Sequence, residues 1–346
     1  MYLHSSAPAW PAHTVSQTET LSLLSSSSVW EKLHPRSRGL VEKVLTGDSG
    51  IAQRHVSSKD VAAMVSAAPH DLAAMFEKAA PALAADALRT ALATGGVSAG
   101  ELDALFICTC TGYLCPGVTS HVAEVLGMNS GAMLHDLVGL GCGAAIPALR
   151  AASHFLTAHP DATVAVVAVE ICTAAFFVDD DPGVLISLCL FGDGACATIW
   201  RGKKDSAGTG WRAHGFRSLH QPEHREKIRF VNSGGRLRNQ LHRSVPALAA
   251  SAVKHLHDTD LAAGMFPASR IIAHSGGRDV VLALREALPG HSLTETENVL
   301  RSCGNMSSPS VLIALHEALE SGIRDPLWLT AFGAGFSAHS CRLEHA

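Results

Sequence analysis

Charged residues are scarce in this chain. Asp, Glu, Lys and Arg make up 17% of its 346 residues, against 47% hydrophobic residues, and the net charge is −4. A chain with this balance has no general excess of positive charge for binding nucleic acid or an anionic membrane. Its length and apolar content instead predict a globular protein with a large core, built as one big domain or two fused halves.

Long hydrophobic runs and a charged leader are also missing. The longest apolar run, residues 162–178, is interrupted by Glu170 and is short for a membrane span. The first lysine or arginine is Lys32, so the N-terminus lacks the basic region of a secretory signal. Nine cysteines are an odd number and too few for a disulfide scaffold of this length. We therefore expect a cytoplasmic protein with reduced thiols and no membrane span.

One of these cysteines stands between two glycines, in Gly141-Cys142-Gly143. The segment 144–156 that follows predicts a helix, and Pro147 is tolerated only in its first turn. Cys142 is thus expected at the helix N-terminus, where unpaired N–H groups and the helix dipole lower the pKa of a thiol. The glycines would let a substrate carbonyl approach the backbone closely. A buried structural cysteine between tightly packed glycines is the alternative, and this stretch alone favours neither.

Elsewhere strands alternate with helices along the chain. The near-continuous Val/Ala run at 163–171 is typical of a strand that is covered on both faces. Alternation of this kind predicts an α/β fold around a largely buried sheet. The expected strands are 2–5, 102–110, 133–137, 163–171, 195–200, 270–274 and 327–332, and the expected helices are 62–92, 121–126, 144–156, 245–256, 278–288 and 311–319.

The polar, glycine-rich stretch 202–210 is the best domain boundary. It predicts two α/β halves, residues 1–205 with Cys142 and residues 206–346. In the second half His274 and Asn305 each stand at the end of an expected strand or beside a Gly/Ser turn before a helix. Because ligands bind at the carboxyl ends of strands in open α/β sheets, the three side chains are expected to meet in one pocket.

The three residue types form a coherent chemical set. A thiolate can attack a thioester, an imidazolium can stabilise the thiolate, and the N–H groups of histidine and asparagine can stabilise an oxyanion or enolate. A cysteine protease uses the same residue types, but the apolar surroundings of the cysteine do not favour that interpretation.

Four short motifs resemble those of type III polyketide synthases, the chalcone and stilbene synthase family. They agree with the family in order and spacing, and the resemblance extends from about residue 30 to residue 343. The motifs are Gly139-Leu140-Gly141-Cys142-Gly143, Leu190-Phe191-Gly192-Asp193-Gly194, His274-Ser275-Gly276-Gly277 and Gly304-Asn305-Met306-Ser307-Ser308. The resemblance implies a thiolase fold, in which two duplicated α/β halves form a layered αβαβα arrangement, and a homodimer. It also implies an acyltransferase that uses acyl-CoA and malonyl-CoA as substrates and has no permanently bound cofactor.

The same resemblance implies roles for individual residues. Cys142 would hold the starter and the growing chain, while His274 and Asn305 would orient the thioester and stabilise the enolate formed when malonyl-CoA loses carbon dioxide. Phe191 corresponds to the gatekeeper between the CoA tunnel and the cavity, and Phe230 resembles a second gate phenylalanine. Both phenylalanines have an alternative interpretation as core aromatic residues.

The loop from Cys110 to Pro116 occupies the position of the family's cavity-lining loop. Cys110 and Thr111 would line the cavity, and Cys115 would reach into the cavity of the partner subunit, next to a proline bond that we expect to be cis. The spacing of Cys108, Cys110 and Cys115 is poor for zinc, and no metal is expected.

Two further pocket positions are Ser307 and Ala175. Ala175 stands where chalcone synthase has a threonine, and this smaller apolar residue fits an alkyl starter at least as well as an aromatic one. The basic residues Arg36, Arg38 and Lys43 are candidates for binding the CoA phosphates, although a solvated helix face is the alternative.

One motif departs from the polyketide synthase pattern. Ala331-Phe332-Gly333-Ala334-Gly335 is closer to the ketoacyl synthases that start fatty-acid synthesis. One alternative is therefore a single-condensation ketoacyl synthase, with an acyl carrier protein as partner. Another is a non-catalytic binding subunit of thiolase fold. The sequence does not determine the starter, the number of extensions or the cyclisation; an alkylpyrone or resorcinol-type product is compatible with it.

Overall fold

The computed structural model describes all residues except 59, 266–267 and 346. Its strands are β1 (Tyr2–Ala9), β2 (His13–Ser16), β3 (Gln53–Val56), β4 (Ala104–Cys108), β5 (Met133–Leu137), β6 (Thr163–Glu170), β7 (Gly194–Arg201), β8 (Trp211–His220), β9 (Ile228–Ser233), β10 (Arg236–Leu241), β11 (Arg270–Ala273), β12 (Leu327–Gly333) and β13 (Ser337–His345). Its α-helices are α1 (Gln17–Ser25), α2 (Ser28–Lys32), α3 (Pro35–Thr46), α4 (Val61–Ser66), α5 (Pro69–Gly95), α6 (Val118–Leu126), α7 (Ala145–Ala158), α8 (Pro182–Leu190), α9 (Val245–Ala262), α10 (Arg278–Ala287), α11 (Thr294–Cys303) and α12 (Pro309–Glu320).

A nine-stranded sheet organises the chain, in the order β11-β12-β13-β8-β1-β7-β6-β4-β5. The link between its two parts is slight, because β1 pairs with β8 only at Tyr2 and Arg212. The strand directions repeat on the two sides of this link. β4 is parallel to β6, which is antiparallel to β7, just as β11 is parallel to β12, which is antiparallel to β13.

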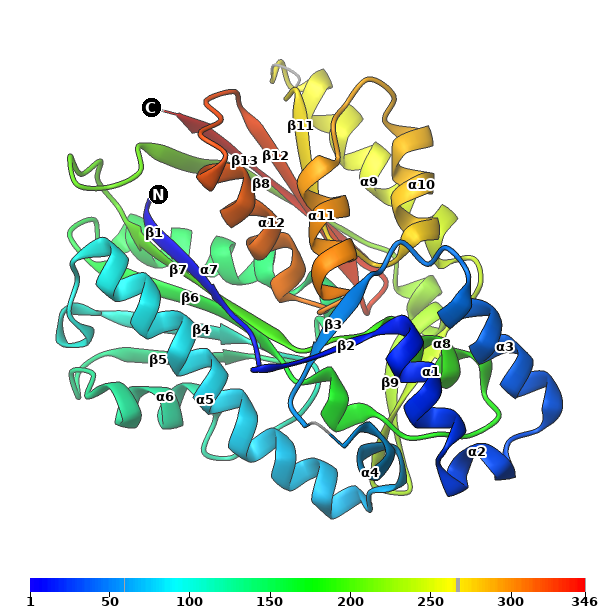
Figure 1. Cartoon of the computed structure of the whole chain (residues 1–346). Coiled ribbons are helices and arrows are strands. Elements are labelled where there is room, and N and C mark those ends of the chain that lie inside the picture. Colours follow the sequence, from blue (N-terminus) through cyan, green and yellow to red (C-terminus); the bar gives the residue numbers. More distant parts are fainter. Residues whose placement is uncertain (59, 266–267, 346) are drawn as a thin grey trace.

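Five layers follow from the way these strands are covered (Figure 1). One core cluster encloses α7 and α12 between β4, β6 and β7 on one side and β11, β12 and β13 on the other. A second cluster joins α5 to the opposite face of β4, β6 and β7, and a third joins α9 and α10 to the opposite face of β11 and β12. The predicted αβαβα arrangement is therefore confirmed.

Strand β6 shows why the sequence pattern is nearly continuous. Val164 and Val166 face the central helices, whereas Ala165 and Val167 face α5. Successive residues of a strand point to opposite faces, so a strand buried on both sides must be apolar throughout.

Some elements differ from the sequence-based expectation. The predicted helix 62–92 is divided into α4 and α5, because the residue before Pro69 is extended and Pro69 begins a new helix. The strand expected at 2–5 continues to Ala9, and the sequence analysis missed β8, β13 and the hairpin of β9 and β10. The predicted domain boundary falls between β7 and β8; the division at residues 205 and 206 stays a prediction.

In the described part of the chain, no helix is both long and apolar enough to cross a membrane.

Candidate active site

Cys142 lies in a 3₁₀ turn (Gly141–Gly143) just before α7, and Pro147 stands in the first turn of that helix as predicted. The turn lies against the end of β12. A Cβ atom on Gly333 would be 2.6 Å from the backbone N of Gly143 and 2.8 Å from that of Cys142. Glycine at 333 thus allows the Cys142 turn, which belongs to one side of the sheet, to lie directly against a strand of the other side.

Ser307 connects the three residues that the sequence analysis assigned to one site. Its Oγ donates a hydrogen bond to Cys142 Sγ (3.1 Å), and its N–H donates to Asn305 Oδ1 (2.8 Å). The ring of His274 lies next to the main chain of Ser307, which raises the pKa of the imidazole. All four residues are buried. The structure therefore brings Cys142, His274 and Asn305 together around one serine.

The backbone of Ser307 is itself unusual. Its φ is +59°, in the left-handed region that residues other than glycine seldom adopt. Such conformations concentrate at functional sites, where the surrounding structure holds them in place. Here the conformation accompanies hydrogen bonds from one residue to several members of the cluster.

Burial governs the protonation of this site. It raises the pKa of the Cys142 thiol to about 12 and lowers the pKa of His274 to about 4. The expectation that the helix N-terminus lowers the pKa of Cys142 is therefore wrong, because the loss of water outweighs the partial charge of the helix end. The hydrogen bond from Ser307 lowers the pKa of Cys142, but less than burial raises it.

The resting site is thus a neutral thiol beside a neutral imidazole. Either charge alone is disfavoured in this enclosure, but a thiolate and an imidazolium formed together by proton transfer attract each other strongly at low dielectric constant. Nδ1 of His274 is buried and forms no hydrogen bond with any described residue. The imidazole is consequently able to accept a proton.

Glu170 lies beneath the site at the end of β6. Its carboxylate accepts hydrogen bonds from the Thr109 hydroxyl, from the N–H of Cys110, from both the N–H and the hydroxyl of Thr111, and from the hydroxyl of Ser308. Burial raises its pKa, and these donors lower it. Glu170 thereby joins the loop after β4 to the loop that contains Asn305. The sequence analysis treated Glu170 only as an interruption of an apolar run, although an acidic residue inside a buried strand is itself a signal.

The loop after β4 has cysteines with different surroundings. Cys110 Sγ is 3.2 Å from Ser307 Oγ and so faces the site, and Thr111 is buried against Glu170. Cys115 is exposed, and the Cys115–Pro116 bond is cis, as predicted. The proposed position of Cys115 in a partner's cavity stays a prediction. Among the described residues, no group of three or more His, Cys, Asp or Glu side chains is arranged to hold a metal ion.

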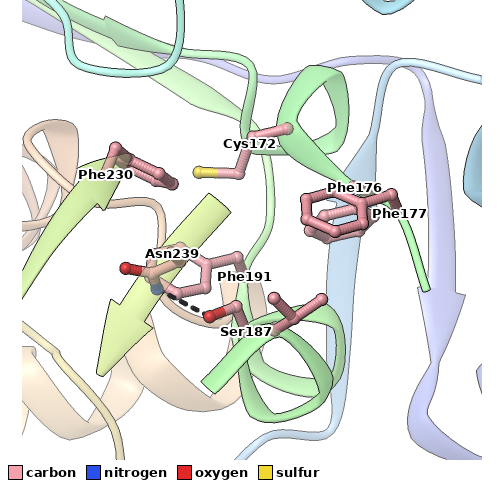
Figure 2. A pocket seen from close by; sticks show the side chains of 9 residues that line it. Cys172, Phe176, Phe177, Ser187, Phe191, Phe230 and Asn239 are labelled. Atoms are coloured by element: carbon pink, nitrogen blue, oxygen red, sulfur yellow. Dashed lines mark hydrogen bonds between the residues drawn. The ribbon is translucent and has the colours of Figure 1, made fainter. Parts of the chain in front are cut away.

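A small pocket lies beside this cluster. Figure 2 shows its aromatic lining. Of the expected gate and pocket residues, Ala175, Phe191 and Phe230 line it, whereas Cys110, Thr111, Cys115 and Ser307 do not. The full lining is Cys172, Ala175, Phe176, Phe177, Val184, Ser187, Phe191, Phe230 and Asn239. The sequence analysis did not single out Cys172, Ser187 or Asn239.

Phe191 connects the pocket to the catalytic cluster. Its backbone forms a bridge with that of Asn305, in which Gly192 N–H donates to Asn305 O (3.0 Å) and Asn305 N–H donates to Leu190 O (2.9 Å). The buried guanidinium of Arg54 donates to the backbone O of Phe191 (2.8 Å). Phe191 is therefore held in place from two sides, and its role as a gate stays a prediction.

The three basic candidates for CoA binding lie on α3, which packs beside α8, the helix that contains Val184 and Ser187 of the pocket. Arg36 and Lys43 are exposed and, seven residues apart, share one face of the helix, whereas Arg38 is half-buried. None of the three side chains forms an ion pair with the described residues.

Comparison with known proteins shows which family this chain resembles. Residues 10–214 match the model described as FAE1/type III polyketide synthase-like protein, and residues 268–345 match 3-oxoacyl-[acyl-carrier-protein] synthase III C terminal. The chain is 30% identical to a 3,5-dihydroxyphenylacetyl-CoA synthase of Streptomyces toyocaensis, over 76% of this chain and 70% of that protein. It is 31% identical to a 1,3,6,8-tetrahydroxynaphthalene synthase of Streptomyces peucetius subsp. caesius, over 74% of this chain and 71% of that protein.

Solved structures share the whole fold. The crystal structure of 1,3,6,8-tetrahydroxynaphthalene synthase from Streptomyces coelicolor A3(2) matches with a TM-score of 0.89 at 24% identity, covering 100% of this chain and 99% of that one. PKS-I from the brown alga Ectocarpus siliculosus matches with a TM-score of 0.90 at 20% identity, covering 100% and 98%. From the family model, the sequence relatives and the fold together, the chain belongs to the type III polyketide synthase family and is an acyltransferase.

Proposed function

We propose that this type III polyketide synthase loads an acyl group from acyl-CoA onto Cys142 and extends it with malonyl-CoA. The observation that carries the proposal is the contact of Ser307 with Cys142, His274 and Asn305 in one buried cluster beside an aromatic pocket. In the loading step, Cys142 Sγ attacks the thioester carbonyl while His274 takes its proton. The tetrahedral oxyanion collapses, and the CoA thiolate leaves with the proton from His274.

Extension uses the same donors. Malonyl-CoA loses carbon dioxide, and N–H groups of His274 and Asn305 stabilise the oxygen of the resulting enolate. The enolate carbon attacks the acyl thioester on Cys142, forms the new carbon–carbon bond and releases the cysteine thiolate. The product is an acyl-CoA that is longer by two carbons.

We propose that several extensions precede ring closure. Relatives include a phloroglucinol synthase of Pseudomonas fluorescens, 24% identical over 95% of both chains, besides the two synthases named above. The pocket that Phe191 lines is mostly apolar, and Ala175 is a small residue in its lining. These features favour an acyl chain that stays in the pocket between condensations.

Product masses test this proposal. The protein is incubated with acetyl-, hexanoyl-, octanoyl- and 4-coumaroyl-CoA in turn, each with ¹³C-labelled malonyl-CoA. Products with two or more labelled units are expected from at least one starter. If no starter acquires any labelled unit, the proposed function is wrong.

A single-condensation ketoacyl synthase is the second candidate. It is favoured by the match of residues 268–345 to the C-terminal part of 3-oxoacyl-ACP synthase III. Products with one labelled unit only, formed faster from malonyl-ACP than from malonyl-CoA, would support it over the iterative synthase. A non-catalytic binding subunit would instead form no acyl adduct on Cys142.

Arg36 and Lys43 are proposed to bind the phosphates of CoA. Reversing both charges (Arg36→Glu with Lys43→Glu) should raise the KM for acyl-CoA about three- to tenfold, and added salt should shrink the effect. The KM for the matching N-acetylcysteamine thioester, which has no phosphate, should not change. Reversal of the exposed Arg324 on the α12–β12 loop serves as the charge-matched control. An equal rise with both thioesters would contradict phosphate binding.

We also propose a homodimer built on the edge strand β5. Large exposed apolar side chains gather on β5, directly after it, on the helix α6 and in the loop before α6: Tyr113, Val125, Met133, Leu134 and Val138. A second copy on this face would cover these side chains and place the exposed Cys115 loop against the partner. Sedimentation at micromolar concentration tests this; a chain that sediments as a monomer would contradict it.

A further inference from the structure

A hydrogen-bonded polar pair, Ser187 and Asn239, interrupts the apolar lining of the pocket. Asn239 Nδ2 donates to Ser187 Oγ (2.6 Å), and Ser187 Oγ donates its single proton to the backbone O of Gly183 (2.6 Å). Because that proton is committed to Gly183, the serine can only accept from Asn239. The nitrogen of the amide must therefore face Ser187.

The oxygen of the same amide faces the other way (Figure 2). Asn239 is the residue of β10 that pairs with Phe230 of β9, and both side chains line the pocket. Asn239 is 7% exposed, and the hydrogen bond of its side chain is the one that Nδ2 donates to Ser187; Oδ1 is not among the fully buried polar atoms that lack a partner, so it faces accessible space. It is thus a hydrogen-bond acceptor of fixed orientation in an otherwise aromatic and aliphatic lining.

Pockets of this composition bind ligands that are largely apolar and use a few polar groups to fix orientation and specificity. We propose that Asn239 Oδ1 accepts a hydrogen bond from an N–H or O–H group of the CoA thioester in the pocket, and so selects substrates that have such a donor. The inference rests on the proposed function. Two parts of a CoA thioester offer this chemistry: the amide N–H of the pantetheine arm, and a hydroxyl or enol on the acyl chain.

Two substrate pairs distinguish these sources. The first pair is the hexanoyl thioester of N-acetylcysteamine and its analogue in which an ester oxygen replaces the amide N–H. The second pair is 6-hydroxyhexanoyl-CoA and hexanoyl-CoA. The measured quantity is the ratio of kcat/KM, donor-bearing over donor-free, within each pair.

In the wild-type protein, the donor-bearing member of one pair should be favoured about three- to tenfold, the usual range for one hydrogen bond. In Asn239→Leu, the ratio of kcat/KM should fall to about 1 for that pair. A fall in the first pair would identify the pantetheine amide as the hydrogen-bond donor, and a fall in the second pair would identify the hydroxyl of the acyl chain. Asn239→Ala, which leaves space rather than filling it, should give the same ratio and covers the case in which the leucine variant does not fold.

Ser187 is proposed as a positioning residue. Ser187→Ala frees the amide of Asn239 to rotate, so the ratio should fall only part of the way, and the same change in the Asn239→Leu background should have no further effect. Gln240→Leu is the matched control, because the next residue of β10 points to the opposite face and should keep the wild-type ratio.

The outcomes separate this inference from the function on which it rests. If the wild-type protein adds no labelled unit to any starter of the panel tested for the proposed function, that function fails and this inference fails with it. If it condenses the four substrates with ratios that Asn239→Leu leaves unchanged in both pairs, only this inference is overturned.

Discussion

Replacing Cys142 by alanine is expected to lower the rate of polyketide formation by at least about 10⁴-fold, the range seen when an enzyme loses its nucleophile. The acyl group then has no sulfur to which it can be transferred, so no carbon–carbon bond forms whatever starter is supplied. Product formation from labelled malonyl-CoA and the mass of the intact protein after mixing with acyl-CoA measure the two parts of this loss. Neither product nor an acyl adduct should be detected.

Cys341→Ala is the matched control. Cys341 is fully buried in the core, on β13, and its removal should cost some stability but leave the acyl adduct in place. In the Cys142→Ala protein, Cys110 is the alternative site for an acyl adduct, because the thiols of Cys110 and Cys142 are both hydrogen-bonded to Ser307. Product formation together with an adduct on Cys110 would mean that Cys142 is not the required nucleophile.

Most of the site could be predicted from the sequence because its determinants are local. A glycine-flanked cysteine before a helix and a histidine after a strand are visible within a few residues of each motif, whereas Asn305, expected at the end of a strand, follows helix α11. The α/β class follows from the same alternation, since β6 is apolar on both faces, whereas the layered arrangement was implied by the family resemblance. Cys142, His274 and Asn305 are found together around Ser307 because the Cys142 turn of one side lies against the end of β12 of the other side.

The remainder depends on contacts that no local pattern shows. Ser187 and Asn239 are 52 residues apart and meet only because β10 lies against α8. The segment of β10, Arg236-Leu237-Arg238-Asn239-Gln240-Leu241, has no clear alternation of apolar and polar residues, and it was missed as a strand.

The direction of the Cys142 pKa shift was predicted wrongly for a related reason. A sequence shows that a thiol stands at a helix N-terminus, but it does not show how completely neighbouring segments exclude water. Here exclusion is nearly complete, and it raises the pKa of the thiol to about 12. The nucleophile therefore depends on proton transfer to a partner, which gives His274 a larger role than the helix dipole.

Loss of either donor should have a different effect from loss of the nucleophile. Asn305→Ala is expected to slow the decarboxylation of malonyl-CoA about 10²- to 10³-fold, the usual cost of removing one oxyanion donor, and His274→Gln, which keeps an N–H group, is expected to slow it less. Decarboxylation without a starter needs enolate stabilisation but no acyl-enzyme. Cys142→Ala should therefore still release carbon dioxide from malonyl-CoA, although it forms no polyketide. Release of ¹⁴CO₂ from labelled malonyl-CoA measures this step alone.

Exposed residues of the same types supply the controls: His255→Gln on α9 and Asn298→Ala on α11 should keep wild-type decarboxylation. In the cluster, Asn305 also accepts the N–H of Ser307 and donates to Gly276 O (3.1 Å), so Asn305→Ala removes a support of the site as well as a donor. His274→Gln keeps an N–H group but no base. It should thus slow acyl loading more than decarboxylation, whereas Asn305→Ala should slow decarboxylation at least as much as loading. Equal losses of both steps in both variants would contradict separate roles and would assign the two residues one shared structural function.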